Sequence, residues 1–180
     1  SMHELQNLMH QLITGGYETT QSAINHGMWA LIRFPEIADK IYKDDSLLKP
    51  FTEEVLRWES PVQFLLRRTQ KDVEVSGTLI PKDSMVMMGY GPANRDENKF
   101  SCPHEFNLDR EGVGAHMAFG SGAHHCPGAL LGRQEMMRSF KFLIQRLKNI
   151  KLDKPLQEPV HNFSMFFMPM KEFFITFDKR

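Results

Sequence analysis

One glycine-punctuated loop decides the fold, and it reads Phe119-Gly120-Ser121-Gly122-Ala123-His124-His125-Cys126-Pro127-Gly128. Its glycines permit positive φ angles and let a flat ligand approach the backbone closely. A helix is expected after Cys126, with Pro127 at its first position. Unpaired amides and the positive end of the helix dipole then favour the thiolate form of Cys126, which binds metals. The alternative is an inert structural thiol, but a free cysteine needs no glycine frame.

The same loop resembles the heme-binding signature of the cytochrome P450 family, F-G-x-G-x-H-x-C-x-G, at every fixed position. The resemblance implies a cofactor, heme b (iron protoporphyrin IX), with Cys126 as the axial ligand of the iron. It implies that His124 contacts a heme propionate. The remaining positions of the implied cofactor-binding loop are Phe119, Gly120, Gly122 and Gly128. A thiolate ligand pushes electron density onto heme iron and favours O–O cleavage.

Upstream, apolar residues recur at helical spacing and predict one long helix that stops at Phe34-Pro35. Gly15 and Gly16 interrupt this helix, at a cost of about 1 kcal/mol each relative to alanine. They favour either close packing against a neighbouring helix or space for a ligand. The neighbouring Glu18 and Thr19 form an acid–alcohol pair, which can organise water and relay protons.

The stretch Gly15-Gly16-Tyr17-Glu18-Thr19-Thr20 resembles the oxygen-activating motif of the P450 family, [AG]-G-x-[DE]-T-[TS]. The resemblance implies that Gly15 and Gly16 lie on the heme face opposite the cysteine. It also implies that Glu18 and Thr19 deliver protons to bound dioxygen.

A second helix is predicted to end at Ser60-Pro61, and on it Glu54 and Arg57 stand three residues apart, close enough to meet. Such a pair alone is usually a surface contact worth under about 1 kcal/mol. With the turn that follows, it resembles the E-x-x-R helix of the P450 family, which implies a buried structural lock with a third basic partner. Glu105 occupies the expected place of that partner, so His104 and Arg110 are the candidates.

Short apolar runs bounded by turn residues predict strands between the second helix and the cysteine. By resemblance, Arg67 holds a heme propionate. The implied substrate-facing residues are Val62, Gln63, Phe64, Leu65, Phe166 and Phe167. The phenylalanine- and methionine-rich tail predicts a hairpin around Pro169 to Glu172. The expected fold is mainly α with small β-sheets (α+β), the C-terminal half of the P450 fold, as a single domain over residues 2–180. We expect Ser1 to be a remnant of tag removal.

Composition sets further bounds. The chain has 180 residues, which fits one domain. Its 22 basic and 22 acidic residues give zero net charge, which argues against a nucleic-acid partner. Two cysteines make no disulfide framework and indicate a reducing cytoplasm. No signal peptide or long apolar span is apparent, so we expect a cytoplasmic protein without a membrane partner.

Members of the P450 family are about twice as long as this chain, so we expect it to lack the first half of the fold. The long helix, which is apolar around much of its circumference, is then expected to carry a bare face. We therefore expect a homo-oligomer or a complementary N-terminal half as partner. Basic residues after the cysteine form either a solvated face or a dock for an electron-donor protein such as a ferredoxin. They are Arg133, Arg138, Lys141, Arg146 and Lys148.

By resemblance, the expected function is a heme-thiolate monooxygenase that oxidises an apolar organic small molecule with O2 and two electrons. The alternative is a non-catalytic, truncated P450-like protein that oligomerises and binds heme weakly or not at all. A third reading takes histidines and cysteines as zinc ligands, although their spacing fits no tight pairing. Those residues are His104, His116, His124, His125, Cys102 and Cys126.

Overall fold

The computed structural model describes residues 1–153, 158–162 and 164–180. The α-helices are α1 (Met2–Arg33), α2 (Pro35–Lys43), α3 (Leu48–Trp58), α4 (Tyr90–Ala93) and α5 (Ala129–Arg146). Three short 3-10 turns are η1 (Asp45–Leu47), η2 (Val113–Ala115) and η3 (Gly122–His124). The strands are β1 (Phe64–Arg68), β2 (Val73–Val75), β3 (Thr78–Ile80), β4 (Met85–Gly89), β5 (Leu147–Leu152), β6 (Val160–His161), β7 (Met170–Glu172) and β8 (Ile175–Lys179).

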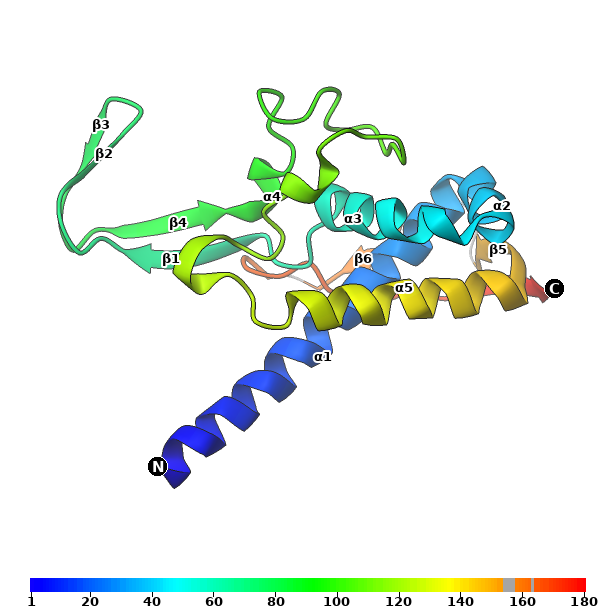
Figure 1. Ribbon diagram of the computed structural model, residues 1–180, viewed down its shortest axis with the longest axis horizontal. Helices are drawn as coiled ribbons and strands as arrows, with labels where there is room; N and C mark the ends of the chain where they lie inside the picture. Colours follow the sequence, from blue (N-terminus) through cyan, green and yellow to red (C-terminus); the bar gives the residue numbers. More distant parts are fainter. Residues whose placement is uncertain (154–157, 163) are drawn as a thin grey trace.

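The predicted long helix is α1, and its two halves have different surroundings. A capping box between Ser1 and Glu4 starts it, and Pro35 begins α2 directly after it. Its C-terminal half is buried, whereas its N-terminal half extends away from the rest of the chain (Figure 1). Large apolar side chains there are more than half exposed, namely Met2, Leu5, Leu8, Met9, Leu12, Ile13 and Tyr17. The helix therefore carries the bare apolar face that the sequence predicts.

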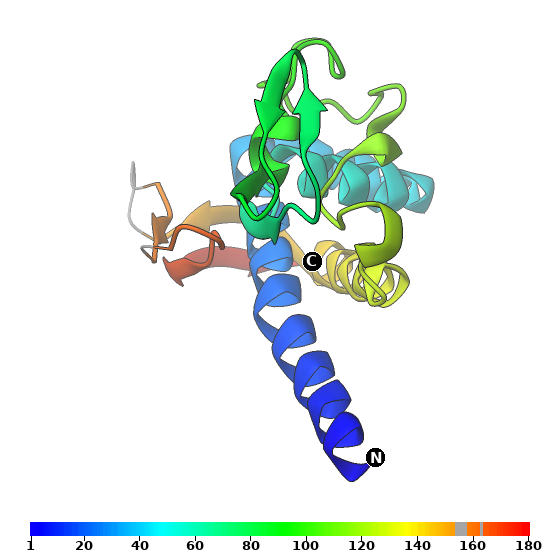
Figure 2. The same cartoon turned by 90° about the vertical axis from the view of Figure 1, so that its left-hand side faces the viewer.

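The core lies where the second half of α1 meets α2, α3 and α5, whose arrangement Figure 2 shows from the side. Phe51 and Phe140 are fully buried at its centre, with ring centroids 5.0 Å apart. Gly27 lets α1 and α5 approach closely, because a Cβ at this position would lie 2.2 Å from the Phe140 ring. Small-residue packing thus explains Gly27 on this helix.

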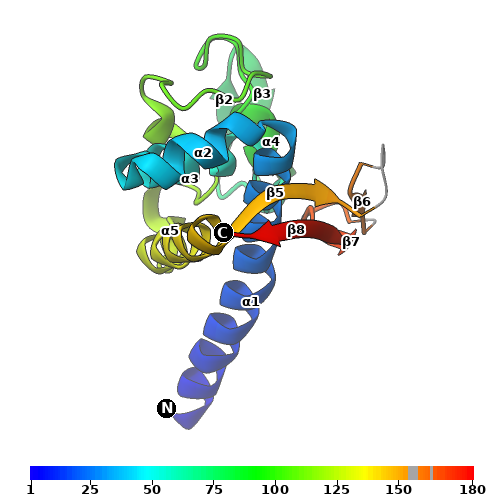
Figure 3. The same ribbon diagram turned by 90° about the vertical axis from the view of Figure 1, so that its right-hand side faces the viewer.

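The strands form small antiparallel pairs beside the helices. β1 pairs with β4, and Arg67 stands opposite Val86 in their register. β5 follows α5 and pairs with the C-terminal strand β8, beside α1 (Figure 3). Val62 and Phe167 form an isolated antiparallel bridge. In the described part of the chain every sheet has two strands, which matches the expected α+β class.

The predicted start of α5 is wrong. Pro127 is not the first residue of α5, because the helix begins at Ala129 with Gly128 as its N-cap. Gly120 and Gly122 both have φ of +68°, a conformation that glycine permits, whereas Gly128 has an ordinary φ of −85°.

The C-terminal hairpin turns earlier than predicted. Residues 170–172 form strand β7, and the amide of Asn162 donates to the carbonyl of Pro169 across the reversal. The Ser164 hydroxyl accepts hydrogen bonds from the amides of Phe166 and Phe167, so the turn chemistry lies before the predicted turn at Pro169 to Glu172. Phe163 lies outside the described residues.

Candidate functional site

One cavity of about 460 Å³ lies between α1, β1, the cysteine loop and the segment around Phe167. Many predicted site residues line it: Gly15, Glu18, Thr19, Val62, Leu65, Arg67, Phe119, Gly120, His124, Cys126 and Phe167. Its volume is within the range of cofactor and ligand sites, about 300–1,000 Å³. The chain therefore brings the cysteine loop and the Glu18–Thr19 pair, over a hundred residues apart in sequence, to the walls of a single cavity.

Other predicted residues do not line this cavity: Gly16, Gln63, Phe64, Gly122, Gly128 and Phe166. A Cβ on Gly16 would meet nothing within 4 Å. The side chain of Gln63 turns instead over Gly91 and donates to the Ser60 carbonyl, while Phe64 packs against Gly89. Alternation along a strand sends neighbouring side chains to opposite faces, so Leu65 reaches the cavity and Phe64 does not.

The cysteine loop is folded by its own backbone. The amide of Cys126 donates to the carbonyl of Phe119 at 2.9 Å, and the amide of Ala129 donates to the Cys126 carbonyl. Positive φ at Gly120 and Gly122 allows this tight return. The half-buried Cys126 therefore reaches the cavity from just before the first turn of α5.

Glu53 of α3 joins α5 to the segment just before the cysteine loop, a contact that the sequence did not predict. Its carboxylate accepts from His116 at 3.0 Å and from Arg133 at 2.7 Å, and the Arg133 guanidinium lies 4.5 Å from the centre of the Phe119 ring. Burial raises the pKa of Glu53, but hydrogen bonds from His116 and Arg133 outweigh it and lower the pKa to about 2. The only sequence feature that points to a role for Glu53 is its position directly before Glu54.

On the α1 wall, Thr19 Oγ1 donates to the Gly15 carbonyl at 2.6 Å. This bond uses the hydroxyl proton and leaves the oxygen lone pairs to accept from water or a ligand. Glu18 lines the same cavity and is exposed to solvent.

Arg67 marks a polar edge of the cavity. Its guanidinium donates to the Tyr90 hydroxyl at 3.3 Å and to the Leu66 carbonyl at 2.9 Å. Tyr90 and His124 line the cavity with it. Three side chains that can donate hydrogen bonds to an anionic group therefore share one cavity with the Cys126 thiol.

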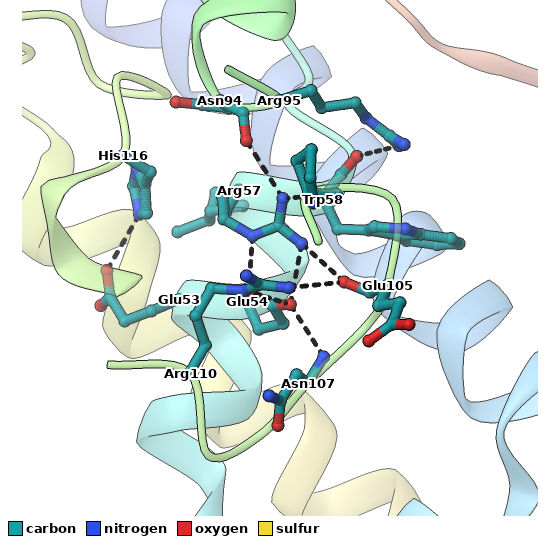
Figure 4. Close-up of polar contacts among 12 residues, drawn as sticks. Glu53, Glu54, Arg57, Trp58, Asn94, Arg95, Glu105, Asn107, Arg110 and His116 are labelled. Carbon is teal, nitrogen blue, oxygen red and sulfur yellow. Dashed lines mark hydrogen bonds and ion pairs between the residues drawn. The ribbon is translucent and has the colours of Figure 1, made fainter. Parts of the chain in front are cut away.

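Behind the cavity, Glu54 and Arg57 form a fully buried pair, with Arg57 Nε 2.7 Å from Glu54 Oε2 (Figure 4). The third basic partner is Arg110, whose Nε lies 3.1 Å from Glu54 Oε1. Glu105 takes part only through its backbone carbonyl, which accepts from both arginines. The lock thus anchors the loop before the cysteine to α3.

Zinc gains no support from the side-chain arrangement. Within residues 1–153, 158–162 and 164–180, no three His, Cys, Asp or Glu side chains gather in a way that could hold a metal ion.

Across the same residues, no helix combines the length and apolar character needed to cross a bilayer.

The cytochrome P450 family model matches residues 1–177. This chain belongs to the cytochrome P450 family. Among curated P450 relatives, it is 36% identical to the methyl-branched lipid omega-hydroxylase of Mycobacterium tuberculosis, covering 98% of this chain and 41% of that protein. It is 38% identical to cytochrome P450 CYP107DY1 of Priestia megaterium, covering 91% of this chain and 40% of that protein.

Solved P450 structures share the fold. CYP109E1 from Bacillus megaterium, in complex with corticosterone, superposes with a TM-score of 0.91 at 32% identity, over 97% of this chain and 47% of that one. CYP109Q5 from Chondromyces apiculatus gives a TM-score of 0.89 at 35% identity, over 95% of this chain and 44% of that one. This P450 chain thus spans about two-fifths of the length of the curated relatives it matches.

Proposed function

We propose that this P450 chain holds heme b in the central cavity and supplies the catalytic core of a heme-thiolate monooxygenase. The observation that carries the proposal is the convergence of Cys126, Thr19 and Arg67 on one cavity. The donor set fits the group: a soft thiolate suits iron, apolar walls suit a flat macrocycle, and a cationic edge suits its propionates.

Each residue has a distinct part in this proposal. Cys126 binds the iron through Sγ, while Arg67, Tyr90 and His124 donate hydrogen bonds to the propionates. When bound, heme b supplies the redox chemistry that activates dioxygen with two electrons. Ala23 and Met136 are buried and Leu65 is half-buried, so these parts of the cavity wall exclude water.

Proton delivery is assigned to Glu18 and Thr19. Thr19 Oγ1 already donates to the Gly15 carbonyl, so its oxygen holds a water by accepting a hydrogen bond from it. Glu18 is exposed, so its carboxyl can take a proton from solvent and pass it to that water. Gly15 leaves room beside this pair, because it carries no side chain into the cavity.

The substrate is assigned as an apolar small molecule. Val62, Leu65 and Phe167 present apolar side chains to the cavity, and Gln63, Phe64 and Phe166 support them from the same segments. One relative is named a methyl-branched lipid omega-hydroxylase, which agrees with a lipid-like guest. A ferredoxin-type protein is the proposed electron donor.

A second polypeptide is proposed to cover α1. The exposed apolar residues of α1 form a helix face that single soluble domains seldom leave bare. The occupant is either a second copy of this chain or a separately made N-terminal half, since the relatives extend well beyond the matched part.

The same exposed face favours a second candidate function, a non-catalytic P450-like protein that oligomerises and binds heme weakly or not at all. The cavity wall on α1 includes Gln11, Thr14 and Glu18, which are all exposed. An open wall weakens the exclusion of water on which both heme retention and oxygen chemistry depend.

Hemin titration separates the two functions. The purified chain is titrated with hemin, and the complex is passed through size-exclusion chromatography with light scattering and a pyridine hemochrome assay. The monooxygenase proposal expects one heme per chain retained by the protein. Loss of all heme on the column supports the non-catalytic protein. Retained heme is followed by an assay for incorporation of 18O from labelled dioxygen into a fatty acid, with a ferredoxin and its reductase supplied.

A further inference from the structure

His26 lies on α1, one turn beyond the cavity-lining Ala23, and its side chain is fully buried. Its two ring nitrogens contact different segments. Nδ1 lies 3.0 Å from the backbone carbonyl oxygen of Glu59, and Nε2 lies 2.9 Å from that of Met168. One ring therefore connects α1 to two segments that are distant in sequence.

Those two segments together form one wall of the cavity. The amide of Met168 donates to the Pro61 carbonyl at 3.0 Å, and the amide of Gln63 donates to the Phe166 carbonyl at 2.8 Å. Between these bonds, Val62 and Phe167 pair as an antiparallel bridge. Both Val62 and Phe167 line the cavity, as does Ala23. The ring thus contacts the wall at Met168, directly after Phe167, and at Glu59, three residues before Val62.

The ring has fewer protons to donate than carbonyls to satisfy. A neutral imidazole carries one N–H donor, and only the imidazolium carries two. Burial lowers the pKa of His26 to about 4, so the ring is neutral at pH 7. The titratable group facing it is His161 of β6, whose ring centroid is 6.0 Å away, whereas Glu59 contacts the ring through its backbone carbonyl and pairs its carboxylate with Arg95. Each tautomer of His26 accordingly holds one of the two segments.

We infer that His26 is a positioning residue that holds the Val62–Phe167 wall against α1 and so sets the shape of the apolar end of the cavity. Without the ring, the carbonyls of Glu59 and Met168 lose a buried hydrogen-bond donor, which makes separation of the wall from α1 easier. The consequence for substrate rests on the function proposed above: an apolar guest fits between Ala23 and the Val62–Phe167 bridge only while this spacing is kept.

Amide hydrogen exchange on the heme-free chain tests the inference through four variants. His26→Phe keeps a ring and removes both nitrogens. His26→Asn places an amide nitrogen as many bonds from Cα as Nδ1, and His26→Gln places one as many bonds away as Nε2. His10→Phe is the matched control, because His10 is an exposed histidine on the same helix.

In His26→Phe, the amides of Gln63 and Met168 are expected to exchange at least about tenfold faster, a loss of about 1.4 kcal/mol of local protection, relative to the Phe140 amide in α5. His26→Gln is expected to restore protection at Met168, and His26→Asn at Gln63. Unchanged exchange in His26→Phe, or equal acceleration in all three His26 variants and in His10→Phe, would overturn the inference.

If His26→Phe fails to fold, 15N NMR of the His26 ring in the wild-type chain still tests the inference. The inference expects one protonated and one unprotonated ring nitrogen at pH 7, with the ring proton protected from solvent exchange. A ring that titrates near its ordinary pKa with a freely exchanging proton contradicts it. Every measurement here uses the heme-free chain, so a failure of His26 to hold the wall is distinguishable from a failure of heme binding, which only the hemin titration reports.

Discussion

At the scale of single residues, Arg57 is the most completely satisfied group near the site. Its five N–H groups donate to both carboxylate oxygens of Glu54 and to the carbonyls of Asn94, Pro103 and Glu105. Both charged side chains have no exposure. A buried pair of this kind is costly to break, because the remaining charge would be buried without a counter-ion and without solvation by water.

Glu54→Gln is therefore expected to destabilise the chain by about 3–5 kcal/mol, since Arg57 and Arg110 would share a buried site without a carboxylate. Glu105→Ala is the control, because the exposed Glu105 contributes only its carbonyl, and it should change stability by less than about 0.5 kcal/mol. Urea unfolding monitored by circular dichroism measures both. Equal stability of the two variants would show that the lock is not needed.

His26 gives the stability of the chain a defined pH dependence. Its folded pKa is about 4 against an ordinary 6.5, so between these values the unfolded ring binds a proton that the folded ring does not. Its contribution is present above pH 6.5 and is lost as the pH falls toward 4. Between pH 7.5 and pH 5, the wild type should lose about 2 kcal/mol more than His26→Gln in urea unfolding. Parallel losses in the two proteins would contradict this pKa.

At the scale of secondary-structure elements, α1 has glycines with opposite roles. A Cβ on Gly27 would collide with Phe140, whereas one on Gly16 would meet open space. Gly27→Ala is therefore expected to destabilise the chain by about 1–3 kcal/mol through overpacking, despite the better helix propensity of alanine. Gly16→Ala should stabilise it by up to about 1 kcal/mol. Thermal unfolding of both variants measures the difference, and the opposite order would refute this packing of α1 on α5.

Periodicity predicted the helices well, because α1, α3 and α5 each carry apolar side chains toward a common core. The cysteine loop was predictable for a different reason, since positive φ at Gly120 and Gly122 restricts which residues fit there. The start of α5 and the C-terminal turn were misplaced, because cap and turn geometry depend on local hydrogen bonds such as those of Ser164.

Contacts between distant segments were the least predictable part of the site. Glu53 is an ordinary acidic residue in sequence, and only the fold brings His116 and Arg133 to it. His26 likewise looks like one more residue of a buried helix, since both of its acceptors are backbone carbonyls that carry no side-chain signal.

At the scale of the whole molecule, the exposed half of α1 is the dominant surface feature. Leu8 and Leu12 lie on it one turn apart, and each is more than half exposed. The chain is expected to self-associate through this face, and the double change Leu8→Lys with Leu12→Lys should shift it toward monomer. Sedimentation velocity measures the shift. An exposed leucine on α5, Leu130→Lys, is the control and should leave association unchanged. A monomeric wild type, or equal effects of both changes, would contradict this surface as the interface.

The central claim is that Cys126 ligates a heme in the cavity, and the carbon monoxide difference spectrum of the reduced, hemin-loaded chain tests it most directly. Wild type and Cys102→Ser, which changes the chain's other free cysteine, should both give the Soret band characteristic of thiolate ligation. Cys126→Ser should lose that band while keeping the wild-type circular dichroism spectrum. A thiolate band that survives in Cys126→Ser, or one that is absent from heme-loaded wild type, would contradict the account.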